Sequence, residues 1–404
     1  MADNNENKVL NVPHLRFPEF TGEWKKYKLS ETCSFFSGGT PSSSKKEYYD
    51  GNIPFIRSGE LHEEQTELFI TEDGYKNSAA KMVEVGDLLL ALYGATSGDI
   101  AISKINGAIN QAILCIRTNQ NKKFIESIWR KHVEKLLQTY LQGGQGNLSA
   151  DIVKNISFYF SRIEEQNKIA EFISLLDERI ATQNKIIEKL QSLIKGLVDS
   201  LLENPSWEKV YLRSFMQFYS TNSLSWEQLS YSNGNVRNLH YGLIHGFQTS
   251  MIDSTRLPRI LPNYLPKQDT MCQDGDVAFA DASEDTNEIG KAIELSNTID
   301  VKTVCGLHTI HGRDIKQSTI LGFKGFAFNS RYFHDQVRRL AQGTKVYSIT
   351  ANNLSSCYVY IPDMIKQKNV VRLLNAYEEY LSLNRTQLNK NEIQKQYLLQ
   401  QMFI

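Results

Sequence analysis

Two long segments of the chain carry apolar residues at alternating steps of four and three. The first segment contains one polar residue in this stripe, Gln183. Its apolar positions are Ile169, Ile173, Leu176, Ile180, Ile187, Leu190, Ile194, Leu197 and Leu201. A heptad stripe sustained over several repeats is typical of a coiled-coil seam, which requires a partner helix.

The second segment repeats the stripe, and Val370 stands 201 residues after Ile169. Its apolar seam positions are Val370, Leu374, Tyr377, Leu381, Leu388 and Leu398. Polar residues such as Asn384 and Asn391 weaken a seam while fixing its register. We therefore expect two helices, over 163–204 and 364–404, that pair antiparallel. The alternative is ordinary core packing, but a periodic stretch of about 35 residues is long for a globular helix and would span about 50 Å.

The segments before these two helices contain the same features in the same order, as an internal repeat does. Trp24 and Trp207 each precede a stretch that alternates as a strand does. Gly86-Asp87 and Gly275-Asp276 each precede an apolar run, as expected for a turn that leads into a buried strand. A short strand is predicted before each long helix, over 156–160 and 357–361. The sequence thus predicts two mixed α/β domains, 1–162 and 205–363, alternating with the helices 163–204 and 364–404, as a pseudo-twofold internal repeat.

Composition narrows the class of protein without deciding it. The 404 residues include 45 Lys and Arg against 45 Asp and Glu, so any nucleic-acid surface must come from local segregation of charge. No apolar run approaches the roughly 18 residues of a membrane helix, and no secretory signal is present, so we expect a cytoplasmic protein that contacts no membrane. The 5 cysteines form no Cys-x-x-Cys pair and are interpreted as reduced core residues.

Several local motifs resemble the specificity (S) subunit of type I restriction-modification systems. They are the run Gly38-Gly39-Thr40-Pro41-Ser42, the stretch from Tyr48 to Leu61, Gly86-Asp87-Leu88-Leu89 followed by Tyr93-Gly94, and the segment from Glu164 to Ala170. The segment from Lys366 to Val370 matches the last of these more loosely. The second half has Ser220-Thr221-Asn222-Ser223 in place of the Gly-Gly-Thr-Pro opening, so the two domains are expected to read different sequences.

The resemblance implies a fold with two target-recognition domains separated by an antiparallel coiled coil. It also implies a function: the chain selects a bipartite site on double-stranded DNA. Partner methyltransferase subunits, two of them expected, bring S-adenosylmethionine for adenine methylation. A restriction subunit translocates and cuts with ATP and Mg²⁺.

The chain itself lacks the motifs of these catalysts. It has no Asn/Asp-Pro-Pro-Tyr/Phe loop, and the nearest string, Asn204-Pro205-Ser206-Trp207, is better interpreted as a helix stop. It has no phosphate-cradling Gly-x-x-x-x-Gly-Lys-Ser/Thr motif and no nuclease motif. His308 and His311 form a histidine pair without a third ligand at motif spacing, so no metal site and no cofactor bound by this chain are predicted.

Candidate DNA contacts are polar and basic residues in corresponding stretches of the two domains. In the first domain they are Thr40, Ser42, Ser43, Lys45, Lys46, Arg57, Ser58, Gln145 and Asn147. In the second they are Asn222, Ser223, Arg237, Asn238, His240, Tyr241, His308, His311, Arg313, Arg338, Arg339 and Lys345. Amide and guanidinium groups read base edges, and clustered Lys and Arg bind phosphates.

Two other interpretations stay open at this level. A coiled-coil adaptor that binds proteins and no DNA would explain the zero net charge and the helices, but not the basic stretch from Arg313 to Lys345. A stand-alone enzyme would have to use His308 and His311.

Overall fold

The computed structural model describes residues 10–141, 148–246, 249–265 and 270–404. The chain divides into two compact units, which we call unit 1 (residues 1–184 and 387–404) and unit 2 (residues 185–386). The two long helices, α5 (Ile163–Leu202) and α11 (Met364–Met402), are each shared between the units. No helix in the described part of the chain is long and apolar enough to cross a membrane.

Unit 1 contains two four-stranded sheets and a strand pair. One sheet has the order β2 (Cys33–Ser37), β9 (Ile113–Thr118), β6 (Leu88–Ala91), β7 (Ile100–Ile102), and the other has β4 (Phe69–Ile70), β3 (Tyr49–Ile56), β8 (Gly107–Ile109), β5 (Lys81–Val83). The pair is β1 (Lys25–Lys28) with β10 (Ser157–Phe160). The helices besides α5 and α11 are α1 (Leu29–Thr32), α2 (Glu72–Lys76), α3 (Lys122–Leu141) and α4 (Ala150–Asn155).

Unit 2 repeats this plan with small additions. Its five-stranded sheet has the order β12 (Met216–Tyr219), β21 (Thr309–Asp314), β17 (Val277–Ala280), β19 (Ala292–Ser296), β15 (Met251–Asp253). Its four-stranded sheet has the order β13 (Leu229–Ser230), β16 (Arg259–Ile260), β14 (Arg237–Leu239), β20 (Thr303–Cys305). Two strand pairs join β11 (Glu208–Tyr211) to β23 (Tyr358–Ile361) and β18 (Ala282–Ser283) to β22 (Tyr347–Ser348). The helices are α6 (Leu212–Phe215), α7 (Tyr241–Gly246), α8 (Phe323–Ala327), α9 (Arg331–Leu340) and α10 (Ala351–Ser356).

The strand order confirms the internal repeat at the level of the fold. The order β2-β9-β6-β7 in unit 1 corresponds to β12-β21-β17-β19 in unit 2. In both units a parallel pair, β3 with β8 or β14 with β20, lies in the second sheet. The mixed α/β fold class expected from the sequence is therefore confirmed, and the predicted strands after Trp24 and Trp207 are β1 and β11.

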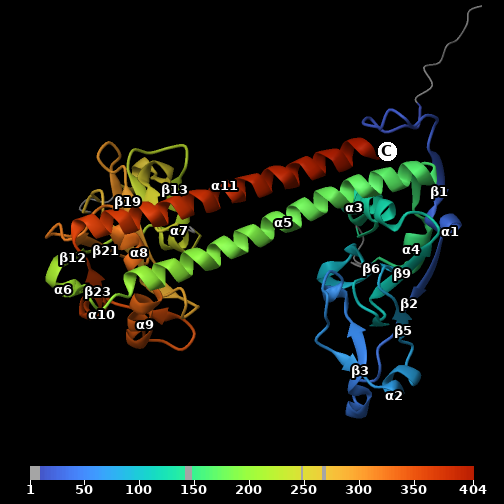
Figure 1. Ribbon diagram of the computed structural model, residues 1–404, viewed down its shortest axis with the longest axis horizontal. Helices are drawn as coiled ribbons and strands as arrows, with labels where there is room; N and C mark the ends of the chain where they lie inside the picture. The colour runs from blue at the N-terminus through green and yellow to red at the C-terminus, as the bar shows by residue number, and fades with distance from the viewer. Residues whose placement is uncertain (1–9, 142–147, 247–248, 266–269) are drawn as a thin grey trace, which may run out of the picture. The chain divides into compact units, whose positions relative to one another are not determined.

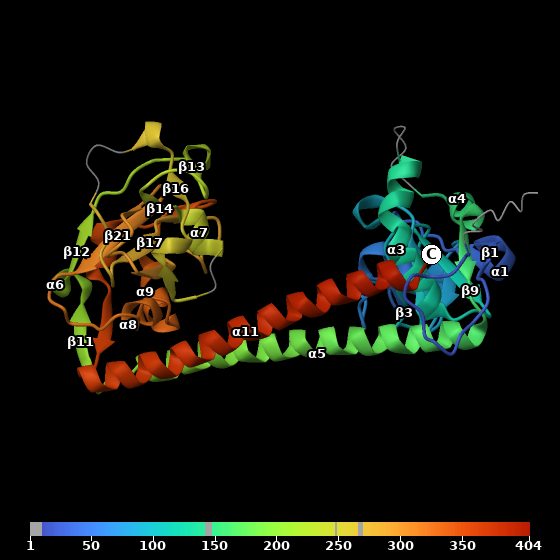
Figure 2. The same cartoon turned by 90° about the horizontal axis from the view of Figure 1, so that it is seen from above.

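Each unit buries one end of both long helices in its own core. In unit 1, Ile169 and Ile173 of α5 share a core cluster with Leu398 and Met402 of α11. In unit 2, Val198 of α5 shares a cluster with Val370 and Leu374 of α11. Figures 1 and 2 show the ribbons of α5 and α11 that these residues belong to. Within each unit, the beginning of one helix thus packs beside the end of the other, which is an antiparallel arrangement. The compact units include these helix ends because the helix side chains complete the cores, so the helices are not separate from the globular parts.

A buried glutamine joins the start of each long helix to a neighbouring loop. Gln166 Nε2 donates to the Gln120 side chain and to the carbonyl of Ser161. Gln367 Nε2 donates to the carbonyls of Ser318 and Pro362. The side-chain oxygens accept from the backbone of Asn121 and of Ile320, respectively. These matched contacts fix the point at which each helix leaves its unit.

Candidate nucleic-acid interface

In unit 1 the loops that follow β2, β3 and β8 meet at one sheet edge. Because β3 and β8 run parallel, their carboxyl ends lie together, with Ile56 beside Ile109. The backbone N–H of Gly39 donates to the carbonyl of Ile109 at 3.2 Å. The Thr40 hydroxyl donates to the Gln111 side chain. This edge therefore holds Thr40 close to Arg57, the residue after β3.

The Gly-Gly opening is required by this close approach. A Cβ atom on Gly38 would lie 1.8 Å from the carbonyl oxygen of Ile109, and one on Gly39 would lie 2.6 Å from the Cβ of Ala79. Only glycine lets the chain pass so near the second sheet. The motif thus has a structural reason, which is to place the residues after it at the sheet edge.

The side chains at the edge of unit 1 are hydroxyls and cations. Thr40, Ser42, Ser43, Lys45, Lys46 and Arg57 are exposed, and Ser58 is half-buried. Arg57 binds both Glu60, at 2.8 Å, and Glu67, at 3.0 Å. Although burial alone would raise the pKa of Glu60, hydrogen bonds from Arg57 and nearby backbone lower it to about 2. The guanidinium is therefore held in place by carboxylates, and its charge is partly neutralised.

The corresponding loops of unit 2 meet at the same edge. The backbone N–H and the side-chain amide of Asn222 both lie within hydrogen-bond distance of the Cys305 carbonyl, at 3.4 and 3.1 Å. Tyr241 N donates to the carbonyl of Leu307 at 3.2 Å. By strand register, Asn222 takes the place of Gly39, and His240 takes the place of Arg57.

Aromatic and histidine rings dominate this edge in unit 2. The ring of His240 lies 4.6 Å from Trp226 and 4.8 Å from Tyr241, and Tyr241 lies 5.2 Å from His308. Trp226 is exposed, and so is the side chain of His308, whose ring contacts Asp281 at 3.2 Å. Tyr241 and His308 were predicted from the sequence, whereas Trp226 was not. A tryptophan close to the predicted opening loop was the available signal.

Three of the predicted base-reading residues are buried and receive structural roles instead. Asn238, His240 and His311 are 0%, 2% and 1% exposed. Asn238 accepts a hydrogen bond from Asn222, His240 accepts one from the backbone of Gly242, and His311 pairs with Asp276. Because a base edge cannot reach these side chains in the described fold, this part of the prediction is corrected. Polarity in the sequence does not show that the rest of unit 2 covers these positions, where the neighbouring Leu239 and Ile310 are buried as well.

Two of the predicted arginines in unit 2 are engaged within the protein. Arg237 donates to the carbonyl of Leu257 and is half-buried. Arg313 binds the buried carboxylate of Asp276 at 2.7 Å. Unit 1 contains the same pair, because Arg117 binds Asp87 at 2.7 Å. The sequence analysis noted both Gly-Asp motifs but missed their arginine partners.

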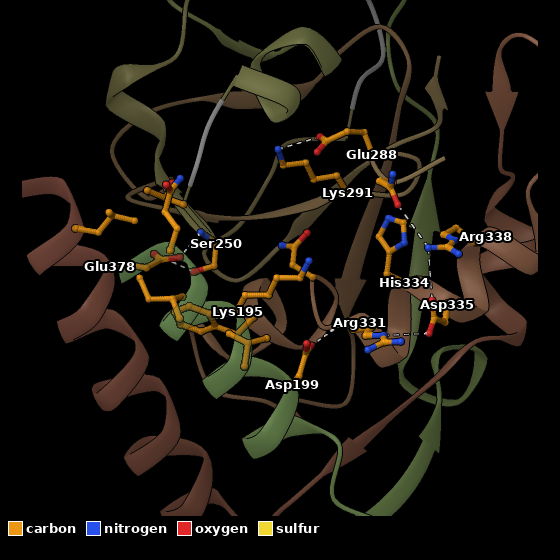
Figure 3. A pocket seen from close by; sticks show the side chains of 18 of the residues that line it. Lys195, Asp199, Ser250, Glu288, Lys291, Arg331, His334, Asp335, Arg338 and Glu378 are labelled. Carbon is orange, nitrogen blue, oxygen red and sulfur yellow. Dashed lines mark hydrogen bonds and ion pairs between the residues drawn. The ribbon is translucent and has the colours of Figure 1, made fainter. Parts of the chain in front are cut away.

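The remaining predicted cations of unit 2 lie on and after α9. Arg338 and Arg339 line a cleft of about 930 Å³ between α9 and the parts of α5 and α11 that belong to unit 2 (Figure 3). The basic residues around this cleft are Lys195, Lys291, Arg331, Arg338, Arg339 and Arg385, and the acids are Asp199, Glu288, Asp335 and Glu378. Lys345 is exposed on the loop after α9. Gln145 and Asn147 of unit 1 lie outside the described residues.

Acidic side chains tie the walls of the cleft together. The carboxylate of Glu378 on α11 accepts from the backbone N–H of Ser250 at 2.9 Å, and burial raises the pKa of Glu378. Hydrogen bonds from His245 and Lys291 lower the pKa of Glu288 to about 2. Several of the acids are thus committed to internal contacts, and Arg338 and Arg339 remain exposed at the rim.

Comparison with known proteins agrees with this geometry. Residues 21–192 match the family model of the type I restriction modification DNA specificity domain. The MjaVIII specificity subunit of Methanocaldococcus jannaschii is 23% identical, over 96% of this chain and 93% of that protein. The EcoR124I/EcoR124II specificity subunit of Escherichia coli is 27% identical over 40% of this chain and 43% of that protein.

Solved structures share the fold along almost the whole chain. The S subunit of a type I restriction-modification system from M. genitalium superposes with a TM-score of 0.58 at 14% identity, over 97% of this chain and 99% of that one. A chain from a structure of the assembly and conformational transition of a type I system gives 0.59 at 14% identity, over 93% and 96%. The repeated fold, the Gly-Gly opening and these matches lead to one conclusion: residues 21–192 match the type I restriction modification DNA specificity domain, and the chain resembles type I specificity subunits along almost its whole length.

Proposed function

We propose that the two sheet edges each read one half of a bipartite target on double-stranded DNA. The observation that carries this proposal is the repetition of one loop arrangement with different exposed side chains. Unit 1 presents hydroxyls and lysines after Gly39, whereas unit 2 presents the exposed Trp226 and His308 beside the half-buried Tyr241. A common scaffold with different polar groups favours two distinct half-sequences.

In this proposal the affinity for DNA comes mainly from contacts between basic side chains and the backbone phosphates. Exposed cations are Lys45 and Lys46 near the recognition edge of unit 1, and in unit 2 Arg338 and Arg339 on α9 and Lys345 on the loop after it. Phosphate contacts of this kind release counterions and make binding steeply dependent on salt. The protein as a whole has zero formal net charge, so this surface is a local feature.

The chain itself is a non-catalytic subunit and acts through partners in the cytoplasm. We propose two methyltransferase subunits, which bring S-adenosylmethionine, and restriction subunits, which use ATP and Mg²⁺. Support for protein partners comes from large apolar side chains exposed along the long helices, among them Leu175 and Tyr397 in unit 1 and Tyr380 and Leu383 in unit 2. Exposed apolar residues in such number are typical of a contact surface.

The experiment that tests half-site reading uses the subunit assembled with its methyltransferase. Methylation is measured on a DNA library in which each half-site is randomised in turn. We expect Arg57→Ala to relax the preference in one half and His308→Ala to relax it in the other, by roughly 10-fold or more in each case. Lys25→Ala, an exposed substitution on β1, serves as the control and should leave both preferences unchanged.

Two outcomes would contradict the proposal. If Arg57→Ala relaxed both halves together, the units would not read independently. If binding to DNA did not weaken between about 50 and 200 mM salt, phosphate contacts would not supply the affinity. The second result would also revive the adaptor interpretation, in which the chain binds only proteins.

A further inference from the structure

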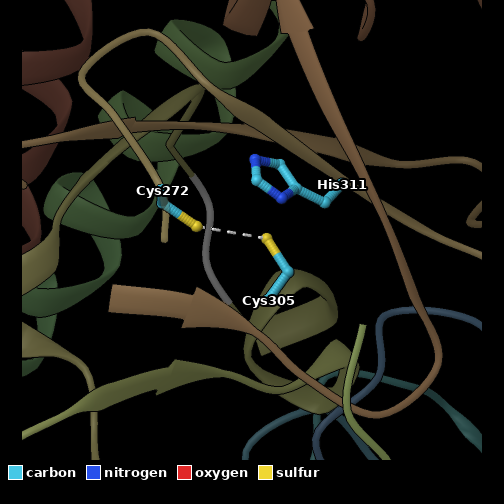
Figure 4. A group of neighbouring side chains, drawn as sticks. All are labelled: Cys272, Cys305 and His311. Atoms are coloured by element: carbon cyan, nitrogen blue, oxygen red, sulfur yellow. Dashed lines mark hydrogen bonds between the residues drawn. The ribbon is translucent and has the colours of Figure 1, made fainter. Parts of the chain in front are cut away.

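Two buried cysteines and a buried histidine meet between the sheets of unit 2. Cys305 ends β20, His311 lies in β21, and Cys272 precedes β17 (Figure 4). The two sulphur atoms are 3.6 Å apart, and one ligand atom from each of the three residues lies within 4.8 Å of the others. Their side chains therefore converge on one point, although they come from three separate segments.

His311 is oriented as a metal-binding histidine is oriented. Its Nε2 atom contacts the carboxylate of Asp276 at 2.7 Å, and Arg313 binds the same carboxylate. The other ring nitrogen, Nδ1, faces the two sulphur atoms (Figure 4). A carboxylate partner on the distal nitrogen fixes the tautomer and leaves the proximal nitrogen free to coordinate, which is the usual outer-shell arrangement for a metal-bound imidazole.

Unit 1 shows that the fold does not need these polar side chains. Strand register places Ile109 where unit 2 has Cys305, and Cys115 where unit 2 has His311. Val83 corresponds to Cys272, because each is bonded or paired to the first residue of the neighbouring strand, β8 or β20. Val83, Ile109 and Cys115 pack in one apolar cluster. The ligand-bearing set is therefore a property of unit 2 alone within the described residues.

We propose that Cys272, Cys305 and His311 bind one zinc ion. Two thiolates and an imidazole are the donors that Zn²⁺ prefers, and with Zn–S bonds of about 2.3 Å, neighbouring ligand atoms lie roughly 3.8 Å apart. The sulphur atoms, now 3.6 Å apart, would move slightly apart, and the separations of up to 4.8 Å within the cluster would contract. On binding, each thiol releases its proton to solvent, and the two thiolate charges balance the ion. Arg313 already balances Asp276, so the buried group carries no net charge.

The ion would join the two sheets of unit 2. Cys305 belongs to the sheet that contains β14 and β20, and His311 belongs to the sheet that contains β17 and β21. Three protein ligands leave the fourth tetrahedral position to a water molecule. The Cys305 carbonyl also accepts a hydrogen bond from the Asn222 side chain, so the site lies directly behind the proposed recognition edge of unit 2. No metal site was predicted here, because the ligands are scattered over the sequence without a spacing motif.

The test uses the purified full-length chain, reduced, stripped with a chelator, and then loaded with Zn²⁺ and dialysed. Elemental analysis is expected to find one zinc per chain. Cys272→Ser and His311→Ala should each lower the retained zinc at least 10-fold. Cys357→Ser is the matched control, because Cys357 is also buried in unit 2 but lies outside the cluster. Retention of full zinc by Cys272→Ser, or less than about one tenth of an ion in the wild type, would overturn the proposal.

A spectroscopic readout keeps the test decisive if a variant fails to fold. Co²⁺ bound to the wild-type chain should give thiolate charge-transfer absorption and the intense visible bands of tetrahedral coordination. Alkylation followed by mass spectrometry distinguishes a disulfide: Cys272 and Cys305 should be protected by zinc and should react once it is removed. A Cys272–Cys305 disulfide in the chain as isolated, with no metal, would overturn the proposal. None of these measurements depends on DNA recognition.

Discussion

Asp87 and Asp276 hold the same position in the two units, and each binds an arginine on the adjacent strand of its sheet. Both carboxylates follow a glycine in the left-handed region, with φ of 92° at Gly86 and 88° at Gly275. In Asp276, burial alone would raise the pKa, but hydrogen bonds from Arg313 and His311 outweigh it and lower the pKa. The Gly-Asp motif therefore serves a structural purpose: it turns the chain and supplies the anion that anchors the neighbouring strand.

Replacing the Asp276 carboxylate by a neutral group should destabilise unit 2. We expect Asp276→Asn to lower the free energy of unfolding by about 2 to 4 kcal/mol, because Arg313 and His311 lose a largely buried partner. Hydrogen–deuterium exchange in a chelator-containing buffer measures the effect on peptides of unit 2. Asp300→Asn, on an exposed residue, is the control. Equal exchange in the two variants would show that the Asp276 contacts contribute little.

Glu288 predicts a specific acid sensitivity of unit 2. Hydrogen bonds from His245 and then Lys291 lower its pKa from 4.5 to about 2. A carboxyl whose folded pKa lies below its unfolded value contributes stability that is complete above the unfolded pKa and is lost as the pH falls through the folded pKa. The difference in Tm between the wild type and Glu288→Gln should therefore shrink steadily from about pH 5 down to about pH 2.5. A difference that stays constant over this range would refute the assignment.

At the recognition edges, some of the predicted DNA contacts are exposed and others are buried. Thr40, Ser42 and Lys46 were predicted to contact DNA, and their side chains are exposed, as such a contact requires. Asn238 and His240 were predicted to contact DNA too but are buried in unit 2. Leu239, between these two residues, is buried as well, so the rest of unit 2 covers both faces of β14. Composition and motif spacing carry no information on that burial.

At the level of elements, the long helices were the most predictable part of the fold. The expected segments 163–204 and 364–404 correspond to α5 and α11, and the seam positions are buried or half-buried. A sustained apolar period is a strong signal because many positions repeat it. The sequence analysis did not identify α3, although Phe124, Ile125, Ile128 and Trp129 form a buried stripe at helical spacing. Strands of two or three residues, such as β13 and β16, are too short to show a period.

Neighbouring leucines on α11 provide a matched test of the seam. Leu374 is fully buried in the core of unit 2, whereas Leu373 is 42% exposed. Leu374→Ala should lower the free energy of unfolding by about 2 to 5 kcal/mol through lost apolar burial and a cavity. Leu373→Ala has the same effect on helix propensity but should stay within about 0.5 kcal/mol. Chemical denaturation followed by circular dichroism measures both, and similar losses would place the seam on the wrong face.

At the level of the whole molecule, the internal repeat connects fold to function. Unit 1 and unit 2 share strand order, the aspartate–arginine pair and the glutamine at the helix start. Their recognition edges differ in exposed chemistry. A protein that recognises two different half-sites requires a shared scaffold and different recognition edges. The scaffold positions the recognition side chains, and the side chains at the edge determine which DNA sequence is bound.

We propose that the paired helices set the distance between the half-sites, and a quantitative prediction follows. Asp177 of α5 contacts Lys395 of α11, so in an antiparallel pair residues 187–193 face residues 379–385. Deleting both heptads removes about 10 Å of rod, which corresponds to about three base pairs of duplex. Methylation of targets with graded spacers should show a preferred spacer shortened by that amount.

The matched control replaces residues 187–193 with a copy of residues 180–186. This keeps the length and the heptad period while changing the side chains, so the preferred spacer should stay as in the wild type. A shortened rod with an unchanged spacer would mean that the duplex, by bending, or the partner subunits set the distance. Because smooth bending of a short site costs several kcal/mol, a spacer fixed by the helices should also be sharply defined, with activity falling on both sides of the optimum.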